Sequence, residues 1–363
     1  MDPRIERHAE LLVDHCTDVQ QGDMVLVRAP DDAEDLLTAV LEKVGERGAM
    51  PLPIRLPARG MTAFASAIDR DNLETPEHLL AAIDAADVFI RIKGSRNLSE
   101  QRDLEPEDQT ALGRAMRPLA DAQEDCRWVA TQYPSTGDAQ KAEMSTRSYE
   151  TFVWNAIDKD WSAQREFQQQ LVEFLDPADE VRIVSGEETD LTMSVAGNPA
   201  VNDYGELNLP GGEVYTAPVP DSVQGTVRFD KPVMALGREI EGAYLEFEDG
   251  EVVAHDAEAN ADVLGGLLET DDGARRLGEL GIGMNRDIYR FTYNMLFDEK
   301  MGDTVHLALG RAYEDTVGEG NEQNESGVHQ DMIVDMCEDS YIAVDGEVVQ
   351  RDGTFVFEDG FSA

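Results

Sequence analysis

The carboxy-terminal half of the chain holds the residues whose types and spacing could bind a metal ion. In the segment 304–310, aliphatic residues alternate with small or polar ones, and His306 is one of the latter. On a strand this alternation turns the imidazole away from the aliphatic core. His329 and Asp331 are two residues apart, so an extended chain points both to one side. The tripeptide alone also occurs on ordinary surface strands.

Three glutamates in the same half stand next to glycines or close to His306. Glu213 follows Gly211-Gly212, and Glu299 precedes His306 by seven residues. Glu279 follows Gly278, near the end of a helix expected to begin around Thr270. Taken singly, each is more often a solvated surface acid in a chain this acidic. Taken together with the histidines and Asp331, they form a candidate metal-binding set.

A set of histidines and carboxylates without cysteine suits borderline divalent ions such as zinc, cobalt or manganese. Cys16, Cys126 and Cys337 are far apart and form no CxxC pair, so neither a disulfide framework nor a thiolate zinc site is expected. Five ligands drawn from the six residues of this set would exceed what a single catalytic zinc uses. They are about right for two ions that share a bridging carboxylate.

The elements of the first half alternate between strand and helix. Short aliphatic strands are expected at 24–27, 51–56, 88–92 and 127–130, and amphipathic helices at 3–16, 32–47, 76–86 and 106–123. Strands separated by helices of this length predict a parallel sheet covered by helices. We therefore expect an α/β amino-terminal domain over residues 1–177.

From about residue 180 the pattern changes to strands joined by short turns. Strands are expected at 181–184 and 191–195, and a hairpin over 244–254 turns at Asp249-Gly250. Asp-Gly pairs recur at 345–346 and 352–353, and between β-rich runs this pair is a strong hairpin signal. The second domain, residues 178–363, is therefore expected to be mainly antiparallel α+β and to carry the metal site.

The charge of the chain excludes whole classes of partner. Aspartate and glutamate total 75 against 30 lysines and arginines, which gives a formal charge of −45 over 363 residues. Nucleic acid and anionic membranes are therefore not expected as partners. The acid is scattered rather than gathered on one face and lysine is scarce, as in proteins from organisms with a salt-filled cytoplasm. No signal peptide or long apolar stretch is apparent, so a cytoplasmic protein is expected.

Four ordered motifs carry a resemblance to a known family. They are Asn208–Pro218 (NLPGGEVYTAP), Arg276–Glu279 with Gly283-Met284-Asn285, Phe297–Lys300 with His306–Gly310 and Tyr313, and His329–Asp331. These segments resemble the M29 metallopeptidases, the thermophilic aminopeptidase T family, and the chain looks like an acidic, haloarchaeal-type member. The resemblance implies an aminopeptidase that acts on peptides with a free amino terminus. It also implies two metal ions in the carboxy-terminal domain and a homodimer.

The resemblance also assigns roles to individual residues. Five residues match the family's metal ligands, with Glu279 as the better candidate to bridge: Glu213, Glu279, His306, His329 and Asp331. Glu299 and Tyr313 match other residues of the same active site. Glu299 is our first choice for the general base. Tyr313 could donate a hydrogen bond to the oxyanion, or could simply be an aromatic residue packed beside the site.

Two alternatives stay open at this point. The nearer one is another dinuclear hydrolase with the same ligands, such as a dipeptidase or an amidohydrolase. A requirement for a free amino terminus would discriminate against it. The more distant one is a non-enzymatic acidic protein that holds calcium or a protein partner, but calcium prefers oxygen ligands, and a site built around two histidines disfavours it.

Overall fold

The computed structural model describes residues 1–100, 102 and 104–362. Contacts within the chain divide it into two compact units. The amino-terminal unit comprises Met1–Lys159 and Gly205–Gly211, and the carboxy-terminal unit comprises Asp160–Tyr204 and Gly212–Ala363. The domain boundary expected at residue 177 stays a prediction.

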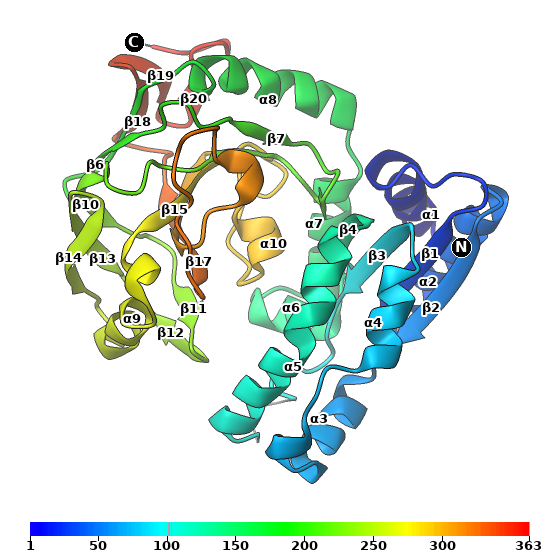
Figure 1. The fold of residues 1–363 in the computed structure, drawn as a ribbon. Coiled ribbons are helices and arrows are strands. Elements are labelled where there is room, and N and C mark those ends of the chain that lie inside the picture. The colour runs from blue at the N-terminus through cyan, green and yellow to red at the C-terminus, as the bar shows by residue number, and fades with distance from the viewer. Residues whose placement is uncertain (101, 103, 363) are drawn as a thin grey trace. The chain divides into compact units, whose positions relative to one another are not determined.

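A parallel sheet forms the centre of the amino-terminal unit (Figure 1). Its strands follow the order β2-β1-β3-β4-β8, and each pairs in parallel with its neighbour. The strands are β1 (Met24–Ala29), β2 (Met50–Arg55), β3 (Val88–Lys93), β4 (Arg127–Gln132) and β8 (Asn208–Leu209). Because β1 lies between β2 and β3, the direction of winding reverses at β1 and β3.

Helices cover both faces of this sheet (Figure 1). The Asp2 side chain accepts a hydrogen bond from Arg4 N–H and so caps the first helix, and Pro3 occupies its first turn. On one face Leu26 and Phe89 pack against α4 and α5. The helices are α1 (Pro3–Glu10), continued as a π-helix over Leu11–Cys16, α2 (Glu34–Glu46), α3 (Ala58–Ala67), α4 (Glu77–Asp84), α5 (Pro106–Glu124), α6 (Thr136–Lys141) and α7 (Thr146–Ile157).

The larger sheet of the carboxy-terminal unit is antiparallel, with the order β14-β13-β10-β6-β5-β18-β19-β20. The expected Asp-Gly hairpins are present between β13 and β14, between β18 and β19, and between β19 and β20. The strands are β5 (Glu180–Ser185), β6 (Thr189–Ser194), β10 (Gln224–Arg228), β13 (Tyr244–Glu248), β14 (Glu251–Asp256), β18 (Ser340–Val344), β19 (Glu347–Arg351) and β20 (Thr354–Phe355).

A second antiparallel sheet of this unit has the order β17-β16-β15-β9-β7. Its strands are β7 (Val201–Asp203), β9 (Glu213–Thr216), β15 (Leu277–Gly283), β16 (Thr304–Gly310) and β17 (His329–Asp335). A short hairpin, β11 (Val233–Ala235) with β12 (Arg238–Ile240), pairs with neither sheet, although its apolar residues join the same core. The helices of the unit are α8 (Trp161–Leu175), α9 (Ala261–Leu268) and α10 (Met295–Asp298).

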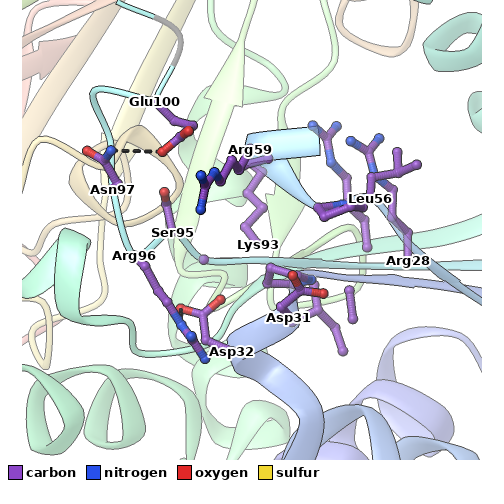
Figure 2. Close-up of a pocket in the computed structure, with 17 residues that line it drawn as sticks. Arg28, Asp31, Asp32, Leu56, Arg59, Lys93, Ser95, Arg96, Asn97 and Glu100 are labelled. Carbon is purple, nitrogen blue, oxygen red and sulfur yellow. Dashed lines mark hydrogen bonds and ion pairs between the residues drawn. The ribbon is translucent and has the colours of Figure 1, made fainter. Parts of the chain in front are cut away.

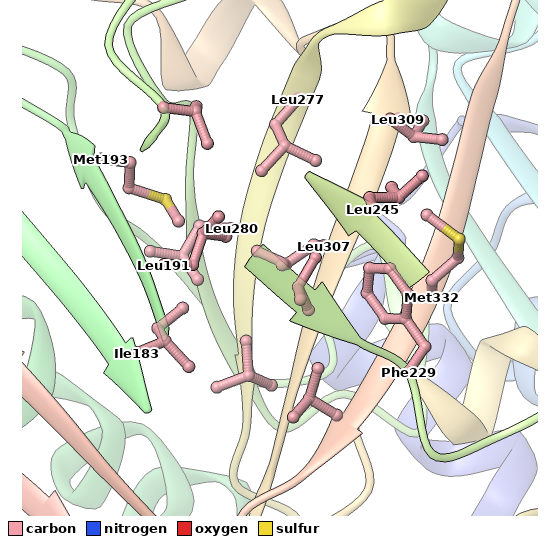
Figure 3. Packing of buried hydrophobic residues seen from close by; sticks show 14 of the residues in the cluster. Ile183, Leu191, Met193, Phe229, Leu245, Leu277, Leu280, Leu307, Leu309 and Met332 are labelled. Carbon is pink, nitrogen blue, oxygen red and sulfur yellow. The ribbon is translucent and has the colours of Figure 1, made fainter. Parts of the chain in front are cut away.

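Aliphatic side chains from the two sheets form one core between them (Figure 3). Ile183 and Leu191 of the larger sheet meet Leu280 and Leu307 of the smaller one. Along β16 the residues Val305, Leu307 and Leu309 enter this core, so the alternate positions face the opposite side of the sheet. This opposite face is the one that carries the candidate ligands.

The parallel, helix-covered sheet and the mainly antiparallel second half confirm the fold class expected from the sequence. Among the described residues, no helix has the length and apolar character needed to cross a membrane.

Candidate metal centre

Four neighbouring strands of the smaller sheet of the carboxy-terminal unit bring the candidate ligands to one face. Strand β15 pairs with β9 on one side and with β16 on the other, and β16 pairs with β17. In this register Ala308 stands between Glu279 and Asp331, and Gly281 is opposite His306. The alternation expected for His306, and the common side expected for His329 and Asp331, are both present.

The helix expected from about Thr270 is limited to a 3-10 helix at Asp272–Arg275, and its expected extension to Glu279 is wrong, because Glu279 lies within strand β15. The strand could not be recognised from the sequence because it contains three glycines, and glycine is uncommon in strands. Here they are required by close approach. A Cβ on Gly281 would lie 2.0 Å from the His306 ring, and one on Gly278 would lie 2.2 Å from the Gly310 carbonyl oxygen. The missing side chain at position 281 therefore makes room for the imidazole.

The five candidate ligands are connected by short distances. His306 Nε2 lies 2.9 Å from Glu279 Oε1 and 3.5 Å from Glu213 Oε2. His329 Nε2 lies 3.5 Å from Asp331 Oδ1 and 3.9 Å from Glu279 Oε2. One ligand atom from each of Glu279, His306 and Asp331 can be chosen so that all three lie within 4.8 Å of one another. Glu279 thus contacts both histidines.

The backbone before Glu213 is held in an unusual conformation. Gly212 has a φ of +117°, and a Cβ there would lie 2.5 Å from Asn285 Cβ. Glycine is therefore required by both the dihedral angle and the available space. Gln168 Nε2 donates to the Glu213 carbonyl oxygen at 2.9 Å, which ties α8 to the start of β9. The Gly-Gly-Glu motif and the hydrogen bond from Gln168 together fix the backbone position of Glu213, and so the point from which its side chain extends into the site.

Lys300 is a member of the site that the sequence patterns did not single out. Its side chain is fully buried, and Nζ lies 2.8 Å from Glu213 Oε1 and 3.7 Å from Asp203 Oδ2. It also forms an ion pair with Glu299. Burial lowers the Lys300 pKa, but these carboxylates outweigh burial and hold the pKa well above its usual value. One signal was available: lysine is rare in this chain, and this one follows Glu299 directly.

The two expected active-site residues outside the ligand set also lie here. Glu299 follows α10 and contacts the centre through Lys300, which bridges it to Glu213. The Tyr313 ring lies 4.8 Å from the His329 ring and 6.4 Å from the Tyr215 ring, measured between centroids. The structure therefore brings together all seven residues selected from the sequence.

Electrostatics in the centre favour charged imidazoles in the metal-free protein. Burial lowers the His306 pKa, but the hydrogen bond to Glu279 and the surrounding carboxylates outweigh it and raise the pKa to about 9. Burial is likewise outweighed at His329, where Asp331 and Glu279 raise the pKa to about 10. Burial raises the Asp331 pKa, but the adjacent imidazole of His329 and the other nearby cations lower it to about 2.

Unpartnered buried oxygens show that this set fits a divalent ion. Glu213 Oε2, Glu279 Oε2 and Asp331 Oδ1 are buried, and none has a hydrogen-bond partner among the described residues. A buried carboxylate oxygen without a partner is costly, and a metal ion would satisfy it. Imidazole nitrogen together with carboxylate oxygen is a donor set suited to zinc, cobalt and manganese.

These pKa values predict that metal uptake releases protons. A histidine must be neutral to bind a metal, whereas His306 and His329 are protonated below pH of about 9 and 10. Burial raises the pKa of the Glu213 carboxyl to about 8. Binding at neutral pH should therefore release about three protons, two from the imidazoles and one from Glu213, and affinity should rise with pH up to this range. Calorimetric titration in buffers of different ionisation enthalpy measures the number. Uptake at pH 7 without proton release would contradict protonated imidazoles in the metal-free centre.

Comparison with known proteins gives a consistent result. The family model described as thermophilic metalloprotease (M29) matches residues 1–361. The chain is 29% identical to Aminopeptidase 2 of Geobacillus stearothermophilus, with 98% of each chain covered. It is 29% identical to Aminopeptidase T of Thermus aquaticus, with 97% and 96% covered. The structure of wild-type AmpT from Thermus thermophilus superposes with a TM-score of 0.86 at 26% identity, covering 98% and 99%. The match over nearly the whole chain, with the expected ligands gathered on one sheet, shows that this protein belongs to the M29 metalloprotease family.

Proposed function

We propose that this metal-dependent aminopeptidase binds two divalent ions through Glu213, Glu279, His306, His329 and Asp331 and releases amino-terminal residues from peptides. The observation that carries the proposal is the contact of Glu279 with both histidines, through a different oxygen in each case. A carboxylate placed in this way can serve two ions at once. The same donors leave zinc, cobalt and manganese as the candidate metals.

The bound ions would supply an activated water and a polarised peptide carbonyl. In this proposal the chain's own residues handle the protons. Glu299 accepts the proton of the attacking water and passes it to the departing amine. Lys300 holds the carboxylates of Glu299 and Glu213 in place through its ion pairs. Tyr313, beside His329, donates a hydrogen bond to the oxyanion that forms at the carbonyl carbon.

Chelation combined with a blocked substrate tests this function. Prolonged dialysis against a chelator should abolish hydrolysis of an aminoacyl p-nitroanilide, and cobalt, manganese or zinc should restore it, because the water depends on the ions for activation. The matched substrate with an acetylated amino group should not be cleaved by the restored enzyme. Full activity without metal would contradict the metal-dependent mechanism, and equal cleavage of the acetylated substrate would favour an amidohydrolase.

We further propose that the protein is a salt-adapted homodimer of the cytoplasm. A formal charge of −45 opposes compaction through like-charge repulsion. Many arginines are already paired with acids at the surface, as Arg182 is with Asp190 and Arg276 with Glu251, yet acids remain in large excess. Salt ions in the solvent would have to screen the repulsion between the acids that have no basic partner. Light scattering on the intact protein at high salt tests the dimer, which requires twice the mass of one chain.

Salt should therefore raise the melting temperature. The Debye length falls from about 10 Å at 0.1 M to about 3 Å at 1 M, so molar potassium chloride should remove most of the repulsion. The melting temperature, followed by circular dichroism, should rise steeply over this range. A melting temperature that stays flat or falls would mean that the acidic surface is not a salt adaptation.

A further inference from the structure

A cavity opens at the carboxyl end of strands β1 and β3 in the amino-terminal unit, away from the residues of the metal centre in sequence and in sheet. Its volume is about 490 Å³, and Figure 2 shows its lining side chains. The sheet order β2-β1-β3 makes this the point where the winding reverses. In open sheets of this kind, ligands bind outside the carboxyl ends of the strands at such a point.

Two arginines stand side by side in the wall of this cavity. Arg28 of β1 and Arg91 of β3 are direct partners in the parallel register, so their side chains leave the same face of the sheet. Both are half-buried. Among the described residues, neither guanidinium forms a hydrogen bond or an ion pair. Burial lowers the pKa of both groups, and the charge of Arg91 lowers that of Arg28 further.

This arrangement is costly unless an anion compensates for it. Like charges on adjacent strands destabilise a sheet, and half-burial removes part of the hydration of each guanidinium. The chain has 75 acidic residues against 30 basic ones, so acids that could have paired with these arginines are abundant. Neither arginine has one as a partner among the described residues. Asp31 and Asp32 lie elsewhere in the wall, and Asp32 is within 3.9 Å of Arg96 (Figure 2).

The cavity is also cationic in a chain that is strongly anionic. Among its described lining residues are Arg59, Lys93 and Arg96 in addition to the two paired-strand arginines, against the acids Asp31, Asp32 and Glu100. The lining therefore carries net positive charge. Guanidinium groups recognise carboxylates through two parallel hydrogen bonds, so a pair of them selects an oxyanion.

A second, apolar cavity adjoins the first. It measures about 230 Å³ and shares Arg28, Leu56 and Arg91 with the larger one. The rest of its wall comes mainly from aliphatic and aromatic side chains of the sheet and of α4 and α5, including Leu79, Ile83, Phe89, Met116 and Leu119. The arginine pair thus stands where a charged chamber meets an apolar one.

We propose that these two chambers form a binding site for a small organic carboxylate, whose oxyanion lies between Arg28 and Arg91 while its apolar group fills the smaller chamber. The apolar chamber argues against a purely polar anion, and the arginines argue against a neutral apolar ligand. Two sources share this chemistry: an aliphatic fatty carboxylate and the carboxyl terminus of an apolar amino acid or peptide. The proposal uses only residues of the amino-terminal unit and does not rest on the proposed function.

Calorimetric titration of the metal-loaded, full-length protein with octanoate tests the proposal. Octanoate should bind, whereas octanamide, which keeps the chain and lacks the charge, should not. Arg28→Gln and Arg91→Gln should each weaken octanoate binding by about tenfold or more, the scale expected for a charge-assisted hydrogen bond. Arg47→Gln is the matched control, because it removes the same charge from the same unit at a guanidinium already paired with Asp14.

The two sources and the apolar chamber are tested separately. In a second titration N-acetylleucine, which an aminopeptidase cannot cleave, replaces octanoate. Tighter binding of octanoate would favour a fatty carboxylate as the ligand, and tighter binding of N-acetylleucine would favour the carboxyl terminus of an apolar amino acid or peptide. Ala120→Trp narrows the apolar chamber from an exposed position and should weaken octanoate binding. Neither arginine variant should lower the melting temperature of the ligand-free protein, because each relieves the like-charge pair. Three results would overturn the proposal. They are no binding of either carboxylate, a loss of octanoate affinity in Arg47→Gln equal to that in the arginine-pair variants, and inorganic phosphate that binds as tightly as octanoate.

Discussion

His306→Ala and Asp331→Ala should each lose both bound metal and aminopeptidase activity. Both side chains lie in the group whose ligand atoms are within 4.8 Å of one another, and Glu279 contacts His306 directly. Removal of either leaves a gap in the donor set and leaves other buried charges without a partner, so the remaining groups hold an ion poorly. Metal content by atomic emission and hydrolysis of an aminoacyl substrate, measured on the same sample, give the two readouts.

A matched control separates this effect from the loss of any imidazole. His255 lies in the same unit at an exposed position, on β14. His255→Ala should therefore keep metal and activity. Metal content near the wild-type level in His306→Ala, with the fold intact by circular dichroism, would show that His306 is not a ligand.

Glu299→Gln should keep its metal and lose turnover. The substitution preserves the size of the side chain and removes its basicity, and Glu299 is not one of the five proposed ligands. We expect kcat to fall by about 10²–10⁴, the range typical of general acid–base catalysis, with little change in metal content. Steady-state kinetics on the metal-loaded variant measures this separation.

Glu299→Gln also removes the negative charge that is paired with Lys300, so a second glutamate-to-glutamine variant is needed as a control. Glu319 is exposed, and Glu319→Gln removes one negative charge from the same unit without contact to the centre. It should leave kcat unchanged. If Glu299→Gln turns over at the wild-type rate, another group accepts the proton, and the role assigned to Glu299 is wrong.

The sequence was sufficient for most of the fold, because local signals and tertiary packing agree. The strand–helix alternation of the first half predicted the parallel sheet, and the Asp-Gly pairs predicted the hairpins of the second half. His329 and Asp331 could be placed on one side of a strand from their spacing alone. These elements follow from chain periodicity, which acts over a few residues.

Features set by contacts between distant segments could not be predicted. Strand β15 was missed because it is rich in glycine. Glycine is needed there because any larger side chain would clash with the His306 ring or the Gly310 carbonyl oxygen, both of which belong to β16. Helices α6, α7 and α8 were not predicted, because they follow one another between β4 and β5 with no strand between them and so break the strand–helix alternation. Lys300 was not singled out, because its role depends on Asp203 and Glu213, which are distant in the sequence, and its rarity and place after Glu299 are weak signals by themselves.

Anomalous X-ray diffraction from crystals of the metal-loaded protein tests the central claim most directly. We expect two anomalous peaks in each chain, at about 2.0–2.2 Å from the ligand atoms. The ligands should be Glu213, Glu279, His306, His329 and Asp331, with Glu279 contributing an oxygen to each ion. A single peak, or peaks bound by other residues, would contradict the proposed dinuclear centre.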